Sequence, residues 1–294
     1  MSTAAGAQAP PLNDVAAAQI MLDRAGFSPG EIDGRPGSRT TTAIAAFQSA
    51  NGVAGNGRLD CATWQRLSSS QTEALTKGTI SAADVAGPFI DRIPEDLPEQ
   101  AKLPALGYTS PLEALAEKFH SSPMLLEKLN PGHRFAAGES ITVPNVIADE
   151  PNTPPAQRPD VTVIVTKETG SLTVKSADGR VLLHAPVTVG SGHDPLPMGT
   201  WKVTGVQLNP TFFYNPALFW DAEPSHSKAK IPPGPNNPVG VVWIDINKEH
   251  YGLHGTPRPS RIGYTESHGC VRLTNWDAMR VAKLVKPGTK VIFE

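Results

Sequence analysis

A cysteine preceded by two histidines is the strongest chemical signal in the sequence. Cys270 stands in the segment 267–273 (SHGCVRL), with His268 two residues and His254 sixteen residues before it. A thiol becomes a strong nucleophile when a neighbouring base or positive charge favours its thiolate. A loop can fold His254 back onto the thiol, and the backbone N–H groups beside Gly269 are candidates for an oxyanion hole. The spacing predicts nucleophilic catalysis by a sulfur that is ionised and aimed by an imidazole.

Two other interpretations of these residues stay open. A cysteine in a strand is commonly a small buried hydrophobic residue, and a single histidine is commonly a hydrogen-bonded polar group. His254, His268 and Cys270 also carry the donor atoms that suit zinc. No HExxH-type helix or carboxylate base accompanies them, which favours the nucleophile over the metal site. If the segment 268–270 is extended, the side chains of His268 and Cys270 share one face.

The same residues resemble the signature of the L,D-transpeptidase catalytic domain, the YkuD family. That signature is a histidine, a loop, and then Ser/Thr-His-Gly-Cys followed by an apolar residue and Arg or Asn. Every part is present, from His254 to the segment 267–272. Residues 197–201 (PMGTW) and 232–240 (PPGPNNPVG) are also similar to segments of that family. The resemblance covers residues 160–294.

The resemblance implies a reaction on peptidoglycan that passes through a thioester. Cys270 would attack a carbonyl of a donor tetrapeptide stem and expel its terminal D-alanine, with His254 as the general base. The carbonyl of Gly255 would orient the imidazole, and backbone N–H groups near Gly269 would bind the oxyanion. The residues expected to shape the site or contact the substrate are His268, Arg272, Ser267, Tyr251 and Thr256. The resemblance implies that no cofactor is needed, and that carbapenem β-lactams acylate the same thiol.

The acceptor of the acyl group decides between several activities. An amine on a second stem peptide makes the chain a cross-linking transpeptidase, and a lysine of a wall-attached lipoprotein makes it an attaching enzyme. Water as acceptor makes it an L,D-carboxypeptidase or an amidase. A hypothesis of a different class is a non-catalytic wall-binding protein whose β domain has lost activity. The intact pair of His254 and Cys270 argues against that last hypothesis.

The elements that must position this site are mostly strands, so we expect a multidomain α+β protein whose residues 160–294 form a β-sandwich or barrel. Apolar runs predict strands near 161–165, 171–175, 181–189, 201–206, 241–246, 251–253 and 291–293. One late helix is expected over 276–285. The segment 209–238 is rich in proline and aromatic residues, and the resemblance to the YkuD family, whose corresponding loop caps the substrate groove, implies a partial lid. The alternative is an ordinary loop anchored by its aromatics.

Residues 12–70 predict a small unit of three short helices. Apolar residues at helical spacing, followed by Gly26, indicate the first, and the others are expected over 40–47 and 60–67. Gln19 and the stretches 32–34 (IDG), 47–48 (FQ) and 60–64 (DCATW) resemble the peptidoglycan-binding domain type 1. That resemblance implies recognition of stem peptide or glycan without catalysis. The alternative is a helical spacer.

Two proline-rich segments, 71–105 and 147–159, are predicted to be linkers, the first with a helix near 72–86. Between them, residues 106–146 predict two helices, the second opened by Ser122-Pro123, and a strand over 139–144. Tyr108 and the segments 129–131 (LNP) and 141–144 (ITVP) resemble a LysM glycan-binding domain of strand–helix–helix–strand form. Thr109-Ser110-Pro111 replaces the Gly-Asp-Thr usual there, so glycan binding stays open.

Composition excludes other classes of function for this 294-residue chain. Its 28 acidic and 26 basic residues give a net charge of −2, which lacks the electrostatic character of a nucleic-acid binder. No apolar run approaches the roughly 20 residues that cross a bilayer. Cys61 and Cys270 are the only cysteines and fall in different expected domains, so no disulfide is predicted. Cys61 has no histidine nearby and is interpreted as structural.

The opening residues lack the basic and apolar pattern of a signal peptide. A cytosolic protein and a mature export product are both compatible with that pattern. The three wall-directed resemblances favour a monomer of the cell envelope, periplasmic or associated with the wall. Its expected partners are peptidoglycan stem peptides and glycan strands, with a wall-attached lipoprotein as a further candidate.

Overall fold

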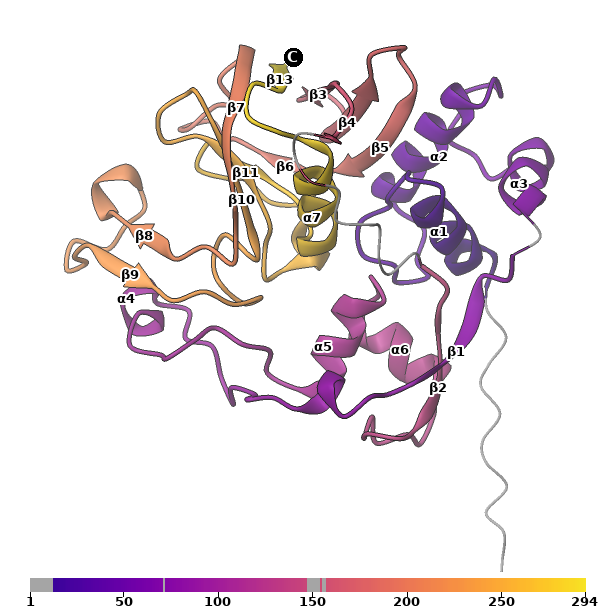
Figure 1. The fold of residues 1–294 in the computed structure, drawn as a ribbon, viewed down its shortest axis with the longest axis horizontal. Coiled ribbons are helices and arrows are strands. Elements are labelled where there is room, and N and C mark those ends of the chain that lie inside the picture. Colours follow the sequence, from indigo (N-terminus) through magenta and orange to yellow (C-terminus); the bar gives the residue numbers. More distant parts are fainter. Residues whose placement is uncertain (1–12, 71, 147–153, 155–156) are drawn as a thin grey trace, which may run out of the picture.

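The computed structural model describes residues 13–70, 72–146, 154 and 157–294. Figure 1 shows three parts around a central helix, α7 (Asn275–Leu284). The N-terminal helices lie on one side of α7, the large sheet lies on the other, and a small mixed unit lies below both. None of the helices in these residues is long and apolar enough to span a bilayer.

The N-terminal unit consists of three helices, as the sequence predicts. They are α1 (Asp14–Arg24), α2 (Ser38–Ala50) and α3 (Cys61–Leu67), followed by the 3₁₀ turn η1 (Ser68–Ser70). Side-chain oxygens of Asn13 and Asp60 cap α1 and α3. Gln19 of α1 holds the following turn, because its amide accepts from the Gly34 N–H at 2.8 Å and donates to Thr40 Oγ1 at 3.1 Å.

The first strand of the middle unit lies outside the range 106–146 that was expected to contain it. Its two antiparallel strands are β1 (Leu75–Thr79) and β2 (Ser140–Pro144), and its helices are α5 (Pro111–Lys118) and α6 (Pro123–Leu129). The helix expected near 72–86 is wrong, since this stretch holds β1 and only a 3₁₀ turn, η2 (Ala83–Val85). β1 forms because β2 supplies its backbone partner from a segment more than sixty residues away.

The C-terminal domain is built on one nine-stranded sheet in the order β5-β4-β3-β13-β7-β10-β11-β12-β6. Its strands are β3 (Val161–Thr166), β4 (Ser171–Ser176), β5 (Val181–Pro186), β6 (Thr188–Val189), β7 (Gly199–Leu208), β10 (Val242–Ile246), β11 (Gly252–His254), β12 (Val271–Arg272) and β13 (Lys290–Phe293). β5 and β6, at the two ends of this order, are separated in the chain by a single residue, Val187. The sheet therefore curls until its ends nearly meet, which agrees with the expected sandwich or barrel.

Helix α7 packs against the sheet of the C-terminal domain. The Thr274 hydroxyl caps it by accepting from the Asp277 N–H at 3.1 Å. Its apolar face joins the main core through residues such as Ala278 and Val281, both fully buried. α7 packs against β10, β11 and β5, so it supports the strands that carry the signature residues.

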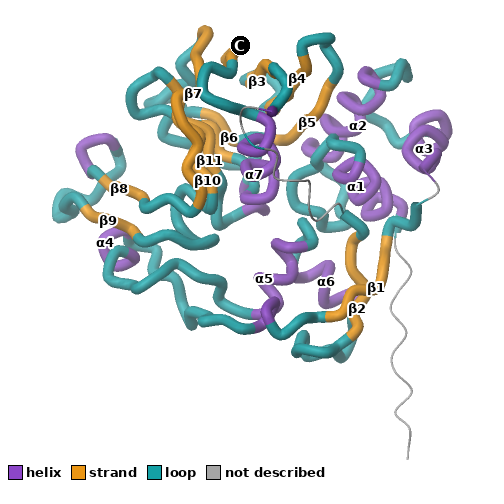
Figure 2. Tube along the Cα trace, in the orientation of Figure 1, coloured by secondary structure: helices purple, strands orange, loops and turns teal. Residues whose placement is uncertain are grey.

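A short hairpin, β8 (Phe212–Tyr214) and β9 (Ala229–Ile231), projects from the sheet within the expected lid. Figure 2 shows that the rest of this region is mostly loop. Tyr214 and Ile231 share a small core with Leu106, and α4 (Leu97–Gln100) packs beside them. The segment before residue 106, expected to be only a linker, is therefore a wall for this hairpin.

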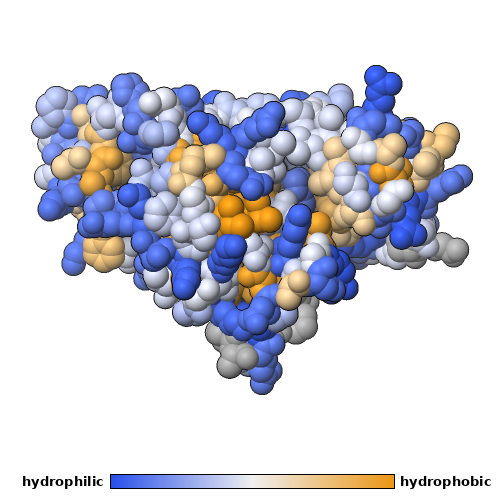
Figure 3. All heavy atoms as spheres, turned by 90° about the horizontal axis from the view of Figure 1, so that it is seen from above, coloured by the Kyte–Doolittle hydropathy of each residue, from blue (hydrophilic) through white to orange (hydrophobic). Residues whose placement is uncertain are grey.

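The three parts meet at a buried cluster of charges. Asp23 of α1 accepts two hydrogen bonds from Arg280 of α7, at 2.8 and 2.9 Å. Nδ1 of His120 lies 3.0 Å from the same carboxylate. Ser28 donates to Asp277 of α7 at 2.7 Å. We call Asp23, Ser28, His120, Asp277 and Arg280 the junction cluster. Away from such contacts the surface is mixed, and Figure 3 shows a face where hydrophobic patches are separated by hydrophilic residues.

Candidate active site

Strands β11 and β12 place the signature residues on one face of the sheet. The two strands run parallel, with Leu253 opposite Val271 and His254 opposite Arg272. Leu253 and Val271 are fully buried in the core. Side chains alternate along a strand, so His254, Arg272 and the preceding Cys270 project from the other face. This register brings the imidazole at the end of β11 close to the thiol that directly precedes β12, although a long loop joins the two strands in the chain.

That face is the floor of a cavity of about 770 Å³. His254, His268, Cys270, Arg272 and Tyr251 all line it. Its other walls are β8 and the loop that follows it, residues 95–97 at the start of α4, and residues of β7 and β10. Five of the sequence-predicted side chains are therefore collected in one space.

The His254 imidazole is held in one orientation. It lies 2.6 Å from the Gly255 carbonyl through Nδ1, and a carbonyl only accepts, so Nδ1 carries the proton. The ring stacks on Trp243 of β10 at 5.5 Å and is 4% exposed. Burial, with the nearby Arg272 charge, lowers the pKa of His254 to about 3. At neutral pH its Nε2 is therefore an uncharged proton acceptor.

The surroundings of the Cys270 thiol favour its neutral form, whereas the sequence predicts an ionised sulfur. Burial raises the pKa of Cys270, against the opposing effects of a Gly252 backbone hydrogen bond and the Arg272 charge. The Asp194 carboxylate adds to the increase in this pKa. The thiol points to the His250 carbonyl at 3.7 Å. Attack by this sulfur therefore needs a base when the substrate arrives.

His268 does not share an extended strand with Cys270. Gly269 has φ +94°, and a Cβ there would lie 2.5 Å from the Tyr251 ring, so the chain bends sharply before β12. The His268 side chain turns toward the lid, where Nε2 contacts Asp221 Oδ1 at 2.7 Å and the ring lies 4.7 Å from that of Phe219. It lines the cavity but faces the lid.

Ser267 and Thr256 lie outside the cavity wall, contrary to their expected contact with substrate. Ser267 is 2% exposed, and its hydroxyl donates to the Cys270 carbonyl at 2.6 Å. Thr256 is 8% exposed, and its Oγ1 accepts from the Arg258 N–H at 3.3 Å. Both hydroxyls are used to shape the turns that flank the strands.

Comparison with known proteins matches the C-terminal domain and the N-terminal helices to two different families. The pattern of the L,D-transpeptidase catalytic domain, YkuD, matches residues 160–293, and that of a peptidoglycan binding domain matches residues 11–67. YqjB of Bacillus subtilis, named as an L,D-transpeptidase, is 31% identical over 139 residues, which are 45% of this chain and 70% of that protein. This chain belongs to the L,D-transpeptidase (YkuD) family.

Two further comparisons describe the extent of the similarity. YkuD of Bacillus licheniformis, also named as an L,D-transpeptidase, is 29% identical over 183 residues, or 61% of this chain and 91% of that protein. A solved L,D-transpeptidase from Mycobacterium smegmatis matches with a TM-score of 0.38 and 21% identity. That match covers 46% of this chain and 58% of the other, so this chain spans less than two thirds of it.

Several residues on the wall of the L,D-transpeptidase site were not singled out from the sequence. Asp194, Asp221 and Asp96 bring carboxylates to the cavity, and Trp243 supports the histidine. Trp243 carries one usable signal, because it stands in an apolar strand that a hairpin pairs with the strand of His254. The three aspartates lie in separate loops, and no local spacing connects them to Cys270.

The zinc alternative finds no matching arrangement in the described part of the chain. No group of three or more His, Cys, Asp or Glu side chains there is placed to hold a metal ion. His268 Nε2, one of the donors in that alternative, is bonded to Asp221. Both cysteines are free thiols, and Cys61 is exposed at the start of α3.

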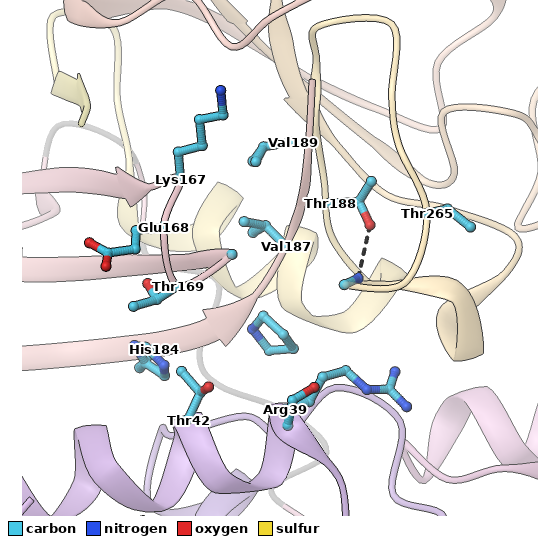
Figure 4. Close-up of a pocket in the computed structure, with 14 residues that line it drawn as sticks. Arg39, Thr42, Lys167, Glu168, Thr169, His184, Val187, Thr188, Val189 and Thr265 are labelled. Carbon is cyan, nitrogen blue, oxygen red and sulfur yellow. Dashed lines mark hydrogen bonds between the residues drawn. The ribbon is translucent and has the colours of Figure 1, made fainter. Parts of the chain in front are cut away.

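A second cavity, of about 280 Å³, lies between α2 and the edge of the L,D-transpeptidase sheet (Figure 4). Arg39 of α2 lines it but donates to the Pro259 carbonyl at 3.3 Å and lies over the Tyr264 ring at 4.7 Å. Thr188 of β6 accepts from the Gly263 N–H at 2.9 Å, the bond drawn in Figure 4. The contacts of Arg39 join the two domains, so the cavity marks a domain contact.

Proposed function

We propose that this chain is a peptidoglycan L,D-transpeptidase with Cys270 as nucleophile and His254 as general base. The observation that carries the proposal is the pairing of β11 with β12. It directs both side chains to one cavity face while the Gly255 carbonyl reserves Nε2 of the imidazole for proton transfer. A neutral base beside a protonated thiol is the starting state that general-base catalysis requires.

The reaction then proceeds in two balanced halves. His254 Nε2 takes the thiol proton while the sulfur attacks the donor carbonyl. The imidazolium returns that proton to the leaving amine, so a D-amino acid departs and a thioester remains. An acceptor amine attacks the thioester, His254 takes its proton, and the proton passes to the departing sulfur. Cys270 and His254 thereby return to their resting states, and the backbone beside Gly269 remains our candidate for the oxyanion contacts.

The charges around the cavity support an amine as acceptor. Among the described residues, four carboxylates line it, from Glu95, Asp96, Asp194 and Asp221, and Arg272 is the one lysine or arginine. A negative wall favours the approach of a cationic amine over that of an anion. Arg272 is suited to a carboxylate of the donor stem, since a guanidinium can bind it with two hydrogen bonds.

The N-terminal unit and the middle unit support peptidoglycan as the polymer on which the chain acts. The peptidoglycan-binding unit is held rigidly against the catalytic domain by the junction cluster, so a bound strand would remain close to the site. The middle unit has two strands and two helices, the element set of a LysM domain, and glycan binding by it is part of the proposal. Together they favour action at the cell envelope.

Mass spectrometry of the intact protein tests this proposal. Incubation with a purified disaccharide-tetrapeptide should give an adduct on Cys270 and release D-alanine, and an added amine should discharge the adduct as a cross-linked product. Discharge by water alone would indicate a carboxypeptidase instead. The Cys270→Ala protein should form no adduct, and Cys61→Ala should behave as wild type. Full turnover by Cys270→Ala would refute the assignment, and acylation by a carbapenem should show the same dependence on Cys270.

A further inference from the structure

Hydrogen bonds of Asn275 connect the middle unit with the backbone near His254. Glu117 of α5 accepts two hydrogen bonds from the Asn275 side-chain amide, at 3.2 and 3.1 Å. Tyr108 donates to the same carboxyl group at 3.0 Å. Asn275 is the first residue of α7 and is 2% exposed, and its amide also donates to the Pro235 carbonyl at 3.1 Å.

The other end of the Asn275 amide presses on the backbone that holds His254. Asn275 Oδ1 accepts from the Val241 N–H at 3.1 Å. A Cβ added to Gly255 would lie 2.2 Å from this oxygen, and one added to Gly240 would lie 2.0 Å from it. The amide therefore fills the space beside both glycines, and neither backbone segment can move toward α7.

The consequence for His254 follows from the Gly255 peptide. The carbonyl that receives the Nδ1 proton of His254 belongs to this same glycine. Any rotation of the Gly255 peptide would break the 2.6 Å bond and free the imidazole to turn. A reacting group misplaced by about 1 Å can cost a hundredfold in rate.

We propose that Glu117 and Asn275 are positioning residues for His254, through which the middle unit keeps the catalytic base in its working orientation. This inference rests on the proposed function. The path runs from Glu117 to the Asn275 amide, from that amide to the Gly255 backbone, and from the Gly255 carbonyl to Nδ1. Neither positioning residue lines the cavity, so neither contacts the substrate.

Glu117 is partly buried at the interface between α5 and α7. Burial raises the pKa of Glu117 to about 7, although the hydrogen bonds from Asn275 and Tyr108 oppose that increase. The neighbouring Glu113 charge raises this pKa further. The conservative variant Glu117→Gln keeps an acceptor oxygen for the Asn275 amide, whereas Glu117→Ala removes it.

Glu113 provides a matched control on the same helix. One turn before Glu117, it accepts from the Asn236 side chain at 2.9 Å, across the same interface. It makes no contact with Asn275 among the described hydrogen bonds. Glu113→Ala therefore loosens the interface but removes no acceptor of the Asn275 amide.

Steady-state kinetics with a tetrapeptide donor and an amine acceptor test the inference. Asn275→Ala and Glu117→Ala should lower kcat about tenfold or more with KM for the donor unchanged. Glu117→Gln should recover most of the rate, and Glu113→Ala should stay within about twofold of wild type. Equal losses in Glu113→Ala and Glu117→Ala, or a loss confined to KM, would overturn it.

A spectroscopic measurement separates this inference from the proposed function. Protein labelled with ¹⁵N-histidine should show the Nδ1-bonded proton of His254 at low field, because the bond to Gly255 is short. Glu117→Ala should shift or broaden that resonance, and Glu113→Ala should leave it in place. An unchanged resonance in Glu117→Ala would contradict the inference even if the wild type proved inactive. Glu117 is only partly buried, so its variants remain usable should Asn275→Ala fail to fold.

Discussion

Asp23 of the junction cluster is fully buried, and the catalytic pair combines a buried His254 with a partly buried Cys270, yet the pKa values of Asp23 and Cys270 shift in opposite directions. Burial acts to raise the pKa of Asp23, but the charges and hydrogen bonds of Arg280 and His120 outweigh it, and the net pKa falls well below its usual value. At Cys270 the single guanidinium of Arg272 does not outweigh burial, and the pKa of the thiol rises.

The difference follows from what each site has to do. A buried carboxylate with a bidentate arginine is an ion pair that fixes α1 against α7. A buried thiol and imidazole without a compensating ion stay neutral, and neutral groups can exchange a proton when substrate arrives. Full charge pairing gives a rigid joint between domains, whereas incomplete pairing leaves chemistry available.

The largest effect is expected at the catalytic pair. His254→Ala removes the only predicted base and should lower the rate of Cys270 acylation by about 10²–10⁴. Intact-mass kinetics with the tetrapeptide donor measures this rate. His268→Ala is the control, since His268 lines the same cavity but faces Asp221. Equal losses of acylation rate in His254→Ala and His268→Ala would contradict the assignment of His254 as the base.

At the junction the effect should fall on stability. Arg280→Ala leaves Asp23 buried without its guanidinium, which typically costs about 3–5 kcal/mol of unfolding free energy. Urea unfolding at neutral pH measures the loss, and acylation of Cys270 at low temperature should remain close to wild type. The double variant Asp23→Leu with Arg280→Leu should recover part of the loss, because it removes both charges. A single variant as stable as wild type would show that the junction holds without this pair.

The pH dependence of Cys270 alkylation tests whether the pKa of this thiol is raised while that of Asp23 is lowered. Since the pKa of Cys270 is raised, its thiolate appears only above the pH at which an ordinary thiol ionises. Alkylation by iodoacetamide, followed by peptide mass spectrometry, should therefore be slow at neutral pH and rise on the alkaline side. Arg272→Gln should move the rise to still higher pH, because the Arg272 charge lowers this pKa. A rise below pH 7 would instead indicate a preformed ion pair with His254.

The burial of His254 adds an expectation for stability against pH. Its folded-state pKa of about 3 lies below the ordinary value, so the folded protein binds fewer protons than the unfolded chain between these values. The stabilising contribution is complete above about pH 6.5 and is lost as the pH falls toward 3. The same direction holds for Asp23, whose lowered pKa favours the folded state until the medium becomes strongly acidic.

Sequence reasoning located the signature residues because their information is local. A histidine, a loop and the segment 267–272 lie close in the chain, and the apolar pattern predicts a strand at 251–253 beside His254, whereas β12 was not predicted. Helical spacing and capping residues likewise predict the helices of the N-terminal unit. The confirmed peptidoglycan-binding resemblance rests on the same kind of short-range pattern.

What the sequence could not predict depends on contacts between distant segments. β1 has no apolar periodicity of its own and becomes a strand only by pairing with β2. The bond between Glu117 and Asn275 joins residues 158 positions apart. The bend before Cys270 is set by packing of Gly269 against Tyr251, which no spacing rule describes. Protonation states are similarly non-local, because burial determines them.

The smallest effect is expected at the lid, where the contact between Asp221 and His268 is exposed instead of buried. Asp221 and His268 are 47% and 24% exposed at the side chain, and such pairs contribute about 0–1 kcal/mol. Asp221→Asn keeps the shape of the contact and should raise KM for the donor by no more than about fivefold, with kcat nearly unchanged. Asp96→Asn, at the opposite wall beside His226, is the control for general loss of cavity charge. A tenfold loss of kcat with KM unchanged would indicate that Asp221 takes part in the reaction. The comparison between the junction cluster and the catalytic pair would then not account for this residue.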